Sequence, residues 1–430
     1  MRVLMFGWEF PPHIAGGLGT ACKGIVEGLA HNGVQTLFVM PSASGDEDQS
    51  CTEIINASDI AVQHVSSSVD EFIDKVKFVY VDSNLVPYVE PDEYFEAIEK
   101  MKKEMVTQTT IGFGQKFKFS GKYGANLMEE VSRYAQVGGT IAMQHNDEFD
   151  VIHAHDWLTY LAGIAAKELT GKPLVVHVHA TSFDRGTDDM VDSRVYAIEK
   201  RGMEMADKVV AVSELTRNIV INKYGIDPSK VVAVHNAVDF SGREDLTVER
   251  GVKDKVVTFL GRITYQKGPE YFIDAAAKVL KRTKGVRFVM AGSGDMMTRA
   301  IRQVARLGIS DRFHFTGFLR GTDVQKMFAL SDVYVMPSVS EPFGISPLEA
   351  MRSNVPSIIS YQSGAAEVLK YAFKVDFWDV DAMADDIYAL VNYPALSTFA
   401  SEHGLEEVNA LKWDYAAAKL KNIYEQLIIK

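Results

Sequence analysis

Residues 1–30, MRVLMFGWEFPPHIAGGLGTACKGIVEGLA, decide the fold of the first part of the chain. Met1–Phe6 is a continuous apolar run typical of a buried strand, and the proline pair that follows prevents its continuation. From Leu18 onward, apolar residues recur at helical spacing. The strand therefore passes into a helix through a turn where a ligand can approach the backbone and exposed amides attract anions. The glycines of this turn are Gly16, Gly17 and Gly19.

This turn does not complete a dinucleotide-binding fingerprint. The third glycine is replaced by Cys22, and the next predicted strand, Gln35–Met40, ends in Pro41 rather than in an acidic residue that would hold a ribose. Two interpretations stay open at this point. The turn binds an anionic or sugar-like ligand, or its glycines serve only the close packing of strand and helix.

Length and composition indicate a globular protein large enough for two domains. The chain has 430 residues, of which 47% are hydrophobic and 24% are charged. No apolar run approaches a membrane span, and the chain starts on a strand rather than on a signal peptide, so we expect a cytoplasmic enzyme without stable membrane insertion. Two cysteines indicate neither a disulfide framework nor a zinc cluster, and a net charge of −12 argues against nucleic acid as a partner.

Strands alternate with helices in both halves of the chain, which predicts parallel sheets covered on both faces. The strands predicted in the first half are Arg2–Phe6, Gln35–Met40, Val76–Val81, Val151–His155, Leu174–His179 and Lys208–Val212. A second series begins near Lys255, and the helix Pro269–Arg282 follows its first strand. The polar stretch 236–255 is the best candidate for a linker. Ligands of such sheets bind at the carboxyl ends of the strands.

Two pairs of histidines lie at such strand ends. The pairs are His153 and His155 in VIHAHDW, and His177 and His179 in VVHVHATSFDRG. The members of a pair share one face because strand side chains alternate. No glutamate or cysteine lies at ligand spacing nearby, so we predict no metal site. These histidines either pack in the sheet or, in the case of His179 with the adjacent Asp156, contact a sugar.

Two cations follow the first strand of the second half. Arg262 lies just beyond this strand, and Lys267 lies before a helix that Gly268 and Pro269 open. Cations beside a helix N-terminus form a phosphate site, unless both are ordinary surface charges. The later turn AGSGD brings further glycines, which allow a base or ribose to approach the backbone. They are Gly292 and Gly294.

The stretch SEPFGISPLEAM, residues 340–351, is the most specific in the chain. It combines Glu341, a glycine turn at Gly344 and a helix start that carries Glu349. Amides near Phe343–Ile345 can bind a phosphate or a sugar hydroxyl, and the carboxylates can accept hydrogen bonds from sugar and ribose hydroxyls. Helix capping alone explains one of these acidic residues but not both.

These stretches together resemble one family. The chain is similar, from residue 7 to 430, to the retaining glycosyltransferases of the GT-B fold, in the family-four group that borders on bacterial and archaeal glycogen (starch) synthases. The matching stretches are AGGLG (15–19), HAHDW (153–157), HVHATSFDRG (177–186), GRITYQKG (261–268), AGSGD (291–295), SEPFGISPLEA (340–350) and LKWDYAAAKLKNIYEQL (411–427).

The resemblance implies an α/β architecture of two doubly wound, Rossmann-like parallel-sheet domains that face a cleft. Residues 1–237 would form the acceptor-side domain, with an insertion at about 89–144 and with the C-terminal helix, about 413–430, packed back onto it. Residues 238–412 would form the domain that binds the nucleotide sugar.

The implied activity is the transfer of a hexose, with retained configuration and without a metal ion. The donor would be ADP-glucose or UDP-glucose, bound as a substrate with no separate cofactor, and the acceptor an α-1,4-glucan or oligosaccharide. By the same resemblance, Arg262 and Lys267 stabilise the departing diphosphate, and the opening glycine turn faces the donor. The remaining implied contacts are Glu341 with the donor sugar, Glu349 with the ribose, His179 with the sugar near its 6-hydroxyl, and Asp156 on the acceptor side.

Two departures from the glycogen synthase pattern leave the donor base and the acceptor open. Ile14 replaces a lysine before the first glycines, and Ser363-Gly364-Ala365 replaces a Thr-Gly-Gly turn. The alternative acceptors are a cell-envelope glycan, a lipid-linked sugar and a sugar phosphate, and a noncatalytic sugar- or nucleotide-binding protein is the other class considered. Aromatic residues in the insertion favour a glucan-binding platform, although such loops also pack on their own domain. They are Phe113, Phe117, Phe119 and Tyr123.

Overall fold

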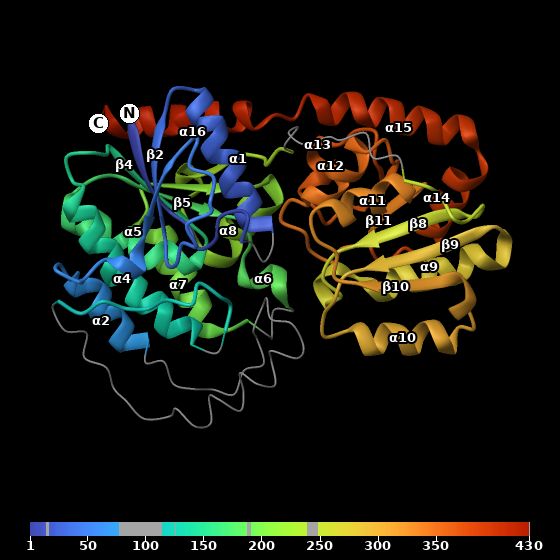
Figure 1. Ribbon diagram of the computed structural model, residues 1–430, viewed down its shortest axis with the longest axis horizontal. Coiled ribbons are helices and arrows are strands. Elements are labelled where there is room, and N and C mark those ends of the chain that lie inside the picture. The colour runs from blue at the N-terminus through green and yellow to red at the C-terminus, as the bar shows by residue number, and fades with distance from the viewer. Residues whose placement is uncertain (14–16, 77–113, 125, 187–190, 239–247, 430) are drawn as a thin grey trace. The chain divides into compact units, whose positions relative to one another are not determined.

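The computed structural model describes residues 1–13, 17–76, 114–124, 126–186, 191–238 and 248–429 (Figure 1). The chain divides into two compact units. Unit 1 comprises Met1–Asn236 together with Trp413–Lys430, and unit 2 comprises Ala237–Lys412. The division therefore falls inside the polar stretch expected as a linker, and the last helix belongs to unit 1.

Unit 1 is built on a seven-stranded sheet in the order β3-β2-β1-β4-β5-β6-β7. Its strands are β1 (Arg2–Phe6), β2 (Gln35–Met40), β3 (Glu53–Asn56), β4 (Val151–His155), β5 (Leu174–Val178), β6 (Lys208–Ala211) and β7 (Val231–Ala233). All neighbours run parallel, and Met5 of β1 lies between Phe38 of β2 and His153 of β4. Residues 77–81 of the predicted strand Val76–Val81 lie outside the described residues.

Helices cover the sheet of unit 1. They are α1 (Gly17–His31), α2 (Ser67–Val76), α4 (Leu127–Gln144), α5 (Trp157–Thr170), α6 (Ser182–Arg185), α7 (Ser193–Met205), α8 (Glu214–Tyr224) and α16 (Trp413–Ile428), with 3-10 turns η1 (Ala57–Asp59) and η3 (Pro228–Lys230). Helix α4 occupies the end of the stretch expected as an insertion, yet most of its residues are buried and it packs along α5. Helix α4 therefore belongs to the packed core of unit 1 and is not an inserted segment.

Unit 2 has a six-stranded parallel sheet in the order β10-β9-β8-β11-β12-β13. Its strands are β8 (Lys255–Leu260), β9 (Val286–Ala291), β10 (Phe313–Gly317), β11 (Val333–Met336), β12 (Ser357–Ser360) and β13 (Phe373–Val375). Its helices are α9 (Pro269–Arg282), α10 (Met297–Arg306), α11 (Thr322–Leu330), α12 (Ile345–Arg352), α13 (Ala365–Val368), α14 (Val380–Asn392) and α15 (Pro394–Asn409), with η4 (Tyr265–Lys267) and η5 (Ser310–Arg312). The predicted pair of parallel-sheet α/β domains is confirmed.

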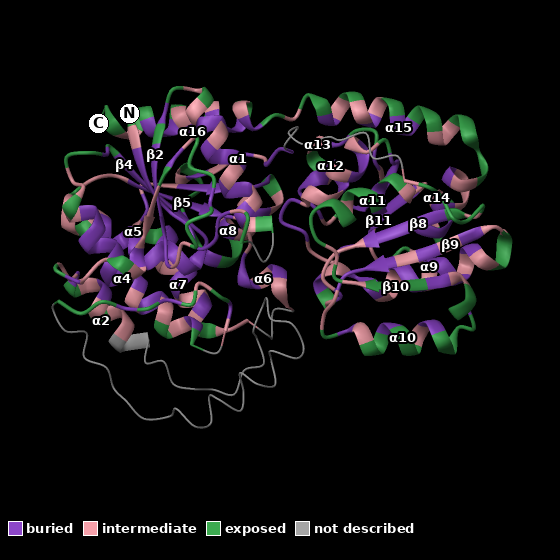
Figure 2. Cartoon of the chain, in the orientation of Figure 1, coloured by how far each residue is buried: buried purple, intermediate pink, exposed green. Residues whose placement is uncertain are grey.

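The inner strands of both sheets, among them β1, β4, β5, β11 and β12, are almost entirely buried, as expected for parallel sheets under helices (Figure 2). The aromatic residues expected to form an acceptor platform lie inside this core. Phe117, Phe119 and Tyr123 expose 5%, 4% and 5% of their surface and belong to the hydrophobic core of unit 1. The platform prediction is therefore wrong for these three residues. Packing the rings in the core removes more apolar area from water than leaving them exposed on a surface loop would. Phe113 lies outside the described residues.

Helix α16 packs against α1 through two glycines of α1. A Cβ atom on Gly24 would lie 2.2 Å from the ring of Trp413, and one on Gly28 would lie 2.7 Å from the Trp413 carbonyl oxygen. The glycines therefore allow the two helices to approach closely. No helix among the described residues combines the length and apolar character needed to cross a membrane.

Candidate functional site

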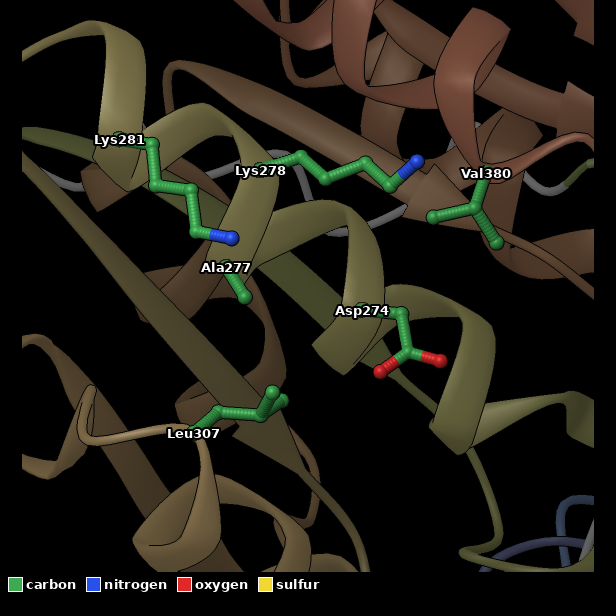
Figure 3. A pocket seen from close by; sticks show the side chains of 6 residues that line it. All are labelled: Asp274, Ala277, Lys278, Lys281, Leu307 and Val380. Atoms are coloured by element: carbon green, nitrogen blue, oxygen red, sulfur yellow. The ribbon is translucent and has the colours of Figure 1, made fainter.

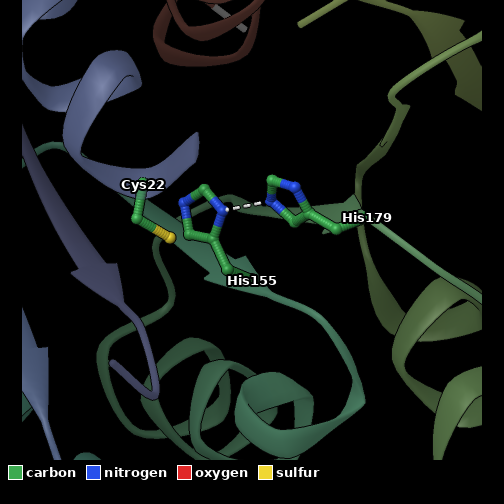
Figure 4. Close-up of side chains that lie close together, drawn as sticks. All are labelled: Cys22, His155 and His179. Carbon is green, nitrogen blue, oxygen red and sulfur yellow. Dashed lines mark hydrogen bonds between the residues drawn. The ribbon is translucent and has the colours of Figure 1, made fainter. Parts of the chain in front are cut away.

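A row of four histidines crosses the sheet of unit 1 at the carboxyl ends of β4 and β5. His153, His155 and His177 are buried, and their rings stack with one another and with the partly exposed His179. Nδ1 of His155 lies 2.9 Å from Nε2 of His179, a hydrogen bond drawn in Figure 4. At the other end of the row, the Tyr424 hydroxyl lies 2.7 Å from Nδ1 of His153.

Burial keeps this histidine row uncharged. Desolvation lowers the pKa of His153 and of His179 to about 3. It also lowers the pKa of His155 and of His177, and the neighbouring imidazoles add to that effect because like charges would repel at these ring distances. The histidines are therefore neutral hydrogen-bonding groups at physiological pH.

Cys22 of α1 lies at the edge of the histidine row, which raises the question of a metal centre. Ligand atoms of Cys22, His155 and His179 lie within 4.8 Å of one another, as do those of His153, His155 and His177. Figure 4 shows the His155 ring between the thiol and the His179 ring, so one ion would need that ring to rotate. The ring is fully buried and already bonded through Nδ1. The cluster of Cys22, His155 and His179 would therefore have to rearrange to hold an ion, and the absence of a metal requirement stays a prediction.

Asp156 links the ends of β4 and β5. Its carboxylate accepts hydrogen bonds from the backbone N–H groups of His179 (2.7 Å) and Ala180 (3.3 Å). Burial raises its pKa to about 7, although Arg185 and the two amides act in the opposite direction. Its backbone has φ 58° and ψ 168°, a strained conformation for a residue with a Cβ. Asp156 therefore holds the segment that carries His179, and it does so with a carboxyl that titrates near neutrality.

The start of α1 already contains a carboxylate of the protein itself. Oε1 of buried Glu9 accepts a hydrogen bond from the amide of Gly19 at 3.0 Å. A Cβ on Gly17 would meet nothing within 4 Å, so packing does not require glycine there. Glu9 thus occupies one of the amides that the sequence predicted to be available for an anionic ligand. The sequence analysis did not anticipate this contact. Gly16 and Ile14 lie outside the described residues.

One predicted cation and one predicted carboxylate of unit 2 meet at the carboxyl ends of its central strands. Nζ of Lys267, in η4 after β8, forms an ion pair with Oε2 of Glu341, in the loop after β11. Nη2 of Arg262 donates to Oε1 of Gln266 at 2.9 Å, and the Ser338 hydroxyl lies 3.3 Å from Oε2 of Glu341. The parallel sheet explains the meeting, because β8 and β11 are neighbours and end at the same edge. Gln266 and Ser338 were not predicted, since neither has a sequence signal of its own.

Three glycines of unit 2 serve close approach between loops. A Cβ on Gly292, at φ 144°, would lie 1.8 Å from the Gly261 carbonyl oxygen, and one on Gly294 would lie 2.3 Å from that of Ile263. A Cβ on Gly268, at φ 65°, would lie 2.1 Å from the Pro337 carbonyl oxygen. The predicted donor-binding glycines 292 and 294 are therefore required by packing against the loop of Arg262, whatever they bind in addition.

The N-terminus of α12 follows directly on the Glu341 loop. Gly344 has φ 93° and precedes Ile345 without a side-chain cap, and Phe343 is buried with its carbonyl oxygen accepting from the Ala365 amide. The Gly364 amide donates to the Glu341 carbonyl oxygen at 3.0 Å, so the Ser363-Gly364-Ala365 turn braces this loop. Glu349, one turn further along α12, is partly buried, and desolvation raises its pKa.

The structure thus collects the predicted residues in two groups. The group in unit 1 contains His179 and Asp156, with His155 added, and the group in unit 2 contains the ion pair of Lys267 and Glu341. Arg262 is bonded to Gln266 in the loop before Lys267, and Glu349 lies on α12, which follows the Glu341 loop. A surface hollow on unit 2 is separate from these loops. It is lined by Asp274, Ala277, Lys278, Lys281, Leu307 and Val380, from α9, the end of α10 and the start of α14 (Figure 3). Lys278 forms an ion pair there with Asp381, so its charge is already neutralised by the protein.

Two sequence families match the chain. The family described as "Glycosyl transferases group 1" matches residues 245–404, and "Glycosyltransferase Family 4" matches residues 126–241. An uncharacterized glycosyltransferase of Methanocaldococcus jannaschii is 27% identical over 99% of this chain and 98% of its own. A glycogen synthase of Mycobacterium tuberculosis is 24% identical over 86% and 80%, and a D-inositol 3-phosphate glycosyltransferase of Catenulispora acidiphila is 27% identical over 67% and 73%.

Solved structures share the fold. The sucrose-phosphate synthase of Thermosynechococcus elongatus matches with a TM-score of 0.70 at 16% identity, over 100% of this chain and 99% of its own. The Anabaena protein HepE, solved with UDP and glucose, matches with a TM-score of 0.67 at 16% identity, over 99% and 100%. At these identities the likeness extends to the fold alone.

Proposed function

We propose that this chain, a group 1 glycosyltransferase of the GT-B type, transfers glucose from UDP-glucose or ADP-glucose to an α-glucan with retention of configuration. The nucleotide sugar is a substrate, and the transfer needs no cofactor and no metal ion. The observation that carries the proposal is the ion pair of Lys267 with Glu341 at the carboxyl edge of the unit 2 sheet, with Arg262 bonded to Gln266 in the loop that carries Lys267.

The charges of this group fit the departure of a nucleoside diphosphate. Negative charge grows on the diphosphate as the bond to the sugar breaks, and cations held in place before the reaction stabilise that charge most effectively. Glu341 orients Lys267 through the ion pair, and Gln266 orients Arg262. The second carboxylate oxygen of Glu341 is then available to accept from a hydroxyl of the donor sugar, and Glu349 accepts from the ribose.

In unit 1, His179 and Asp156 supply the contacts to the transferred sugar and the acceptor. The pKa of His179 is far below neutrality, so the imidazole acts as a neutral hydrogen-bonding group rather than as a cation. Asp156 can hold or accept a proton near pH 7 because its pKa is raised to about 7. This suits a residue that contacts the attacking hydroxyl.

The donor and acceptor are argued from the relatives. HepE is a fold neighbour solved with UDP and glucose, and the glycogen synthase relative aligns with most of this chain, which supports a glucose donor and a glucan acceptor. A sugar phosphate is the second candidate acceptor, supported by the D-inositol 3-phosphate glycosyltransferase relative at 27% identity. Burial of Phe117, Phe119 and Tyr123 removes the aromatic argument for a glucan, so this choice rests on the relatives.

The proposal is tested by offering UDP-glucose and ADP-glucose in turn with glycogen, maltooligosaccharides, inositol phosphate and a lipid extract. We expect transfer to a glucan, an anomeric configuration that NMR of the product identifies as α, and loss of transfer in Lys267→Ala. The control is Lys278→Ala, which removes a lysine that is ion-paired with Asp381 on the outer side of α9. Transfer to another acceptor alone would reject the glucan, and equal activity of the two variants would reject the phosphate role of Lys267.

A further inference from the structure

His155 holds the imidazole of His179 in a fixed position. Its own ring is fully buried between those of His153 and His177, at centroid distances of 4.3 and 5.2 Å. His179 is in turn stacked on His177 at 4.4 Å, and its backbone N–H is bonded to Asp156. With both rings confined, the hydrogen bond of 2.9 Å between them has a defined geometry.

The direction of this hydrogen bond follows from the other nitrogen of His155. Nε2 of His155 is buried and has no hydrogen-bond partner among the described residues. If His179 donated from Nε2, the neutral His155 ring would carry its proton on Nε2, as a buried N–H without an acceptor. If His155 donates from Nδ1, its buried Nε2 carries no proton, and each N–H of the pair has an acceptor or access to solvent. A buried, unpaired N–H is rare because it gives up its hydrogen bond to water without gaining another.

The environment of Nε2 agrees with this choice. Figure 4 shows the Cys22 thiol on the side of the His155 ring away from His179. Burial raises the pKa of this thiol, so it stays protonated and presents an S–H group, a weak donor. A bare nitrogen is the better neighbour for such a group than a second N–H.

We infer that His155 is a positioning residue, which holds His179 in the tautomer that carries its proton on Nδ1 and so presents His179 as a hydrogen-bond donor to an oxygen atom of the bound ligand. The part of this inference that names the ligand, a sugar with a hydroxyl at this point, rests on the proposed function. The tautomer does not.

The consequence is a selection by chemical class. Nδ1–H of His179 is satisfied by a hydroxyl, carbonyl or phosphate oxygen, whereas an amine or a C–H group at that point leaves it unpaired. A site built to pair with a substrate hydroxyl discriminates strongly against an analogue without it, because the buried polar group then loses its partner.

The tautomer is read directly from ligand-free protein labelled with ¹⁵N-histidine, using long-range ¹H–¹⁵N correlations assigned with His179→Gln. We expect His179 to carry its proton on Nδ1 in the wild type and in His155→Asn, whose amide N–H₂ lies near the place of Nδ1. In His155→Leu, which has no donor, a fraction of His179 should shift to the Nε2–H form. Tyr424→Phe is the matched control, since it also deletes a hydrogen bond to a buried imidazole of the row but leaves His179 untouched.

Kinetics supply the second readout. We expect His155→Leu to lower kcat/KM for the preferred nucleotide sugar at least tenfold, but less than twofold for its 6-deoxy analogue, while His155→Asn and Tyr424→Phe stay within about threefold of the wild type. A wild-type His179 protonated on Nε2, or an unchanged tautomer in His155→Leu, overturns the role of His155 whatever the enzyme transfers. The expected tautomer with equal losses for both donors instead rejects the sugar contact of the proposed function.

Discussion

The hydroxyl of Tyr424 on the C-terminal helix lies 2.7 Å from Nδ1 of His153 on β4, across 271 positions of sequence. Both side chains are fully buried. The last helix of the chain is therefore bonded to the end of the histidine row that lies away from His179, and its packing on α1 is expected to contribute to the stability of unit 1.

Gly24→Ala and Gly28→Ala test this packing. We expect each to lower the free energy of unfolding by about 1–3 kcal/mol, because the new methyl group meets Trp413 and overpacked interfaces cost about that much. Gly17→Ala, on the same helix but with open space around its Cβ, is the control and should lose no stability. Urea unfolding followed by tryptophan fluorescence measures all three, and a stable Gly28→Ala variant would show that α16 does not need the close approach.

The histidine row should make unit 1 sensitive to acid. The pKa of His153 and of His179 is about 3 in the fold and about 6.5 in an unfolded chain, so the unfolded state binds more protons between these pH values. Stability is then full above pH 6.5 and falls as the pH drops toward 3, by up to about 1.4 kcal/mol per pH unit for each histidine. Asp156 and Glu199 act in the opposite direction because burial raises their pKa.

Within unit 1, four lowered histidines outweigh the two raised carboxyls, so the urea midpoint of unit 1 should be lower at pH 5 than at pH 7. His177→Phe keeps a ring in the stack and removes one of these groups, and it should make the midpoint less dependent on pH. His314→Gln, which changes an exposed histidine of unit 2, should not. A wild-type midpoint that rises with acid would mean that the carboxyls dominate.

Glu341→Gln should lower kcat more than it raises the KM for the donor. The substitution keeps the size of the side chain but removes the charge that is paired with Lys267. The proposed contact of Lys267 to the departing diphosphate should then weaken in the transition state. The loss of one such group costs about 3–4 kcal/mol in the transition state. Initial rates at saturating and limiting donor measure the two constants, and a change confined to KM would assign Glu341 to ground-state binding.

Glu349→Gln should show the reverse pattern, a higher donor KM with little change in kcat. Under the proposed function its carboxylate accepts hydrogen bonds from the ribose, and such a contact would change little during the reaction. Burial raises the pKa of Glu349, so this carboxylate takes up its proton at a higher pH than an ordinary glutamate does. When the solution is acidified, the wild-type KM for the donor should therefore begin to rise at that higher pH. The variant should lack this dependence, and a pH dependence kept in Glu349→Gln would point to another group.

Activity should survive EDTA and dialysis against a chelating resin. Under the proposed function Arg262 and Lys267 supply the positive charge for the diphosphate, and Glu341 is already ion-paired with Lys267, so the donor can be bound without a metal ion. Rates before and after chelation, and after return of Mg²⁺ or Zn²⁺, measure this. Activity that vanishes with EDTA and returns with one metal would make the Cys22 and histidine cluster the first place to look for it.

Sequence alone predicted the alternation of strands and helices and most of the strands, but it missed strands such as β3 (Glu53–Asn56) and β7 (Val231–Ala233). The period and length of the apolar runs predicted four elements with the same first and last residues as in the structure. They are Arg2–Phe6, Gln35–Met40, Val151–His155 and Pro269–Arg282. Local backbone chemistry likewise predicted the turns at Gly268 and Gly344, because each needs a left-handed conformation that glycine adopts without strain.

Other features depended on contacts between residues distant in sequence, and sequence could not decide them. The sequence predicted that Phe117 and Tyr123 form a surface platform, but in the structure they lie in the core of unit 1. Whether a side chain is buried depends on the residues packed around it, and these are distant in sequence. The occupation of the α1 N-terminus by Glu9 has the same origin. Only the tertiary structure brought His155 to His179, 24 positions away, and Lys267 to Glu341, 74 positions away, because parallel strands end at one edge whatever lies between them in the chain.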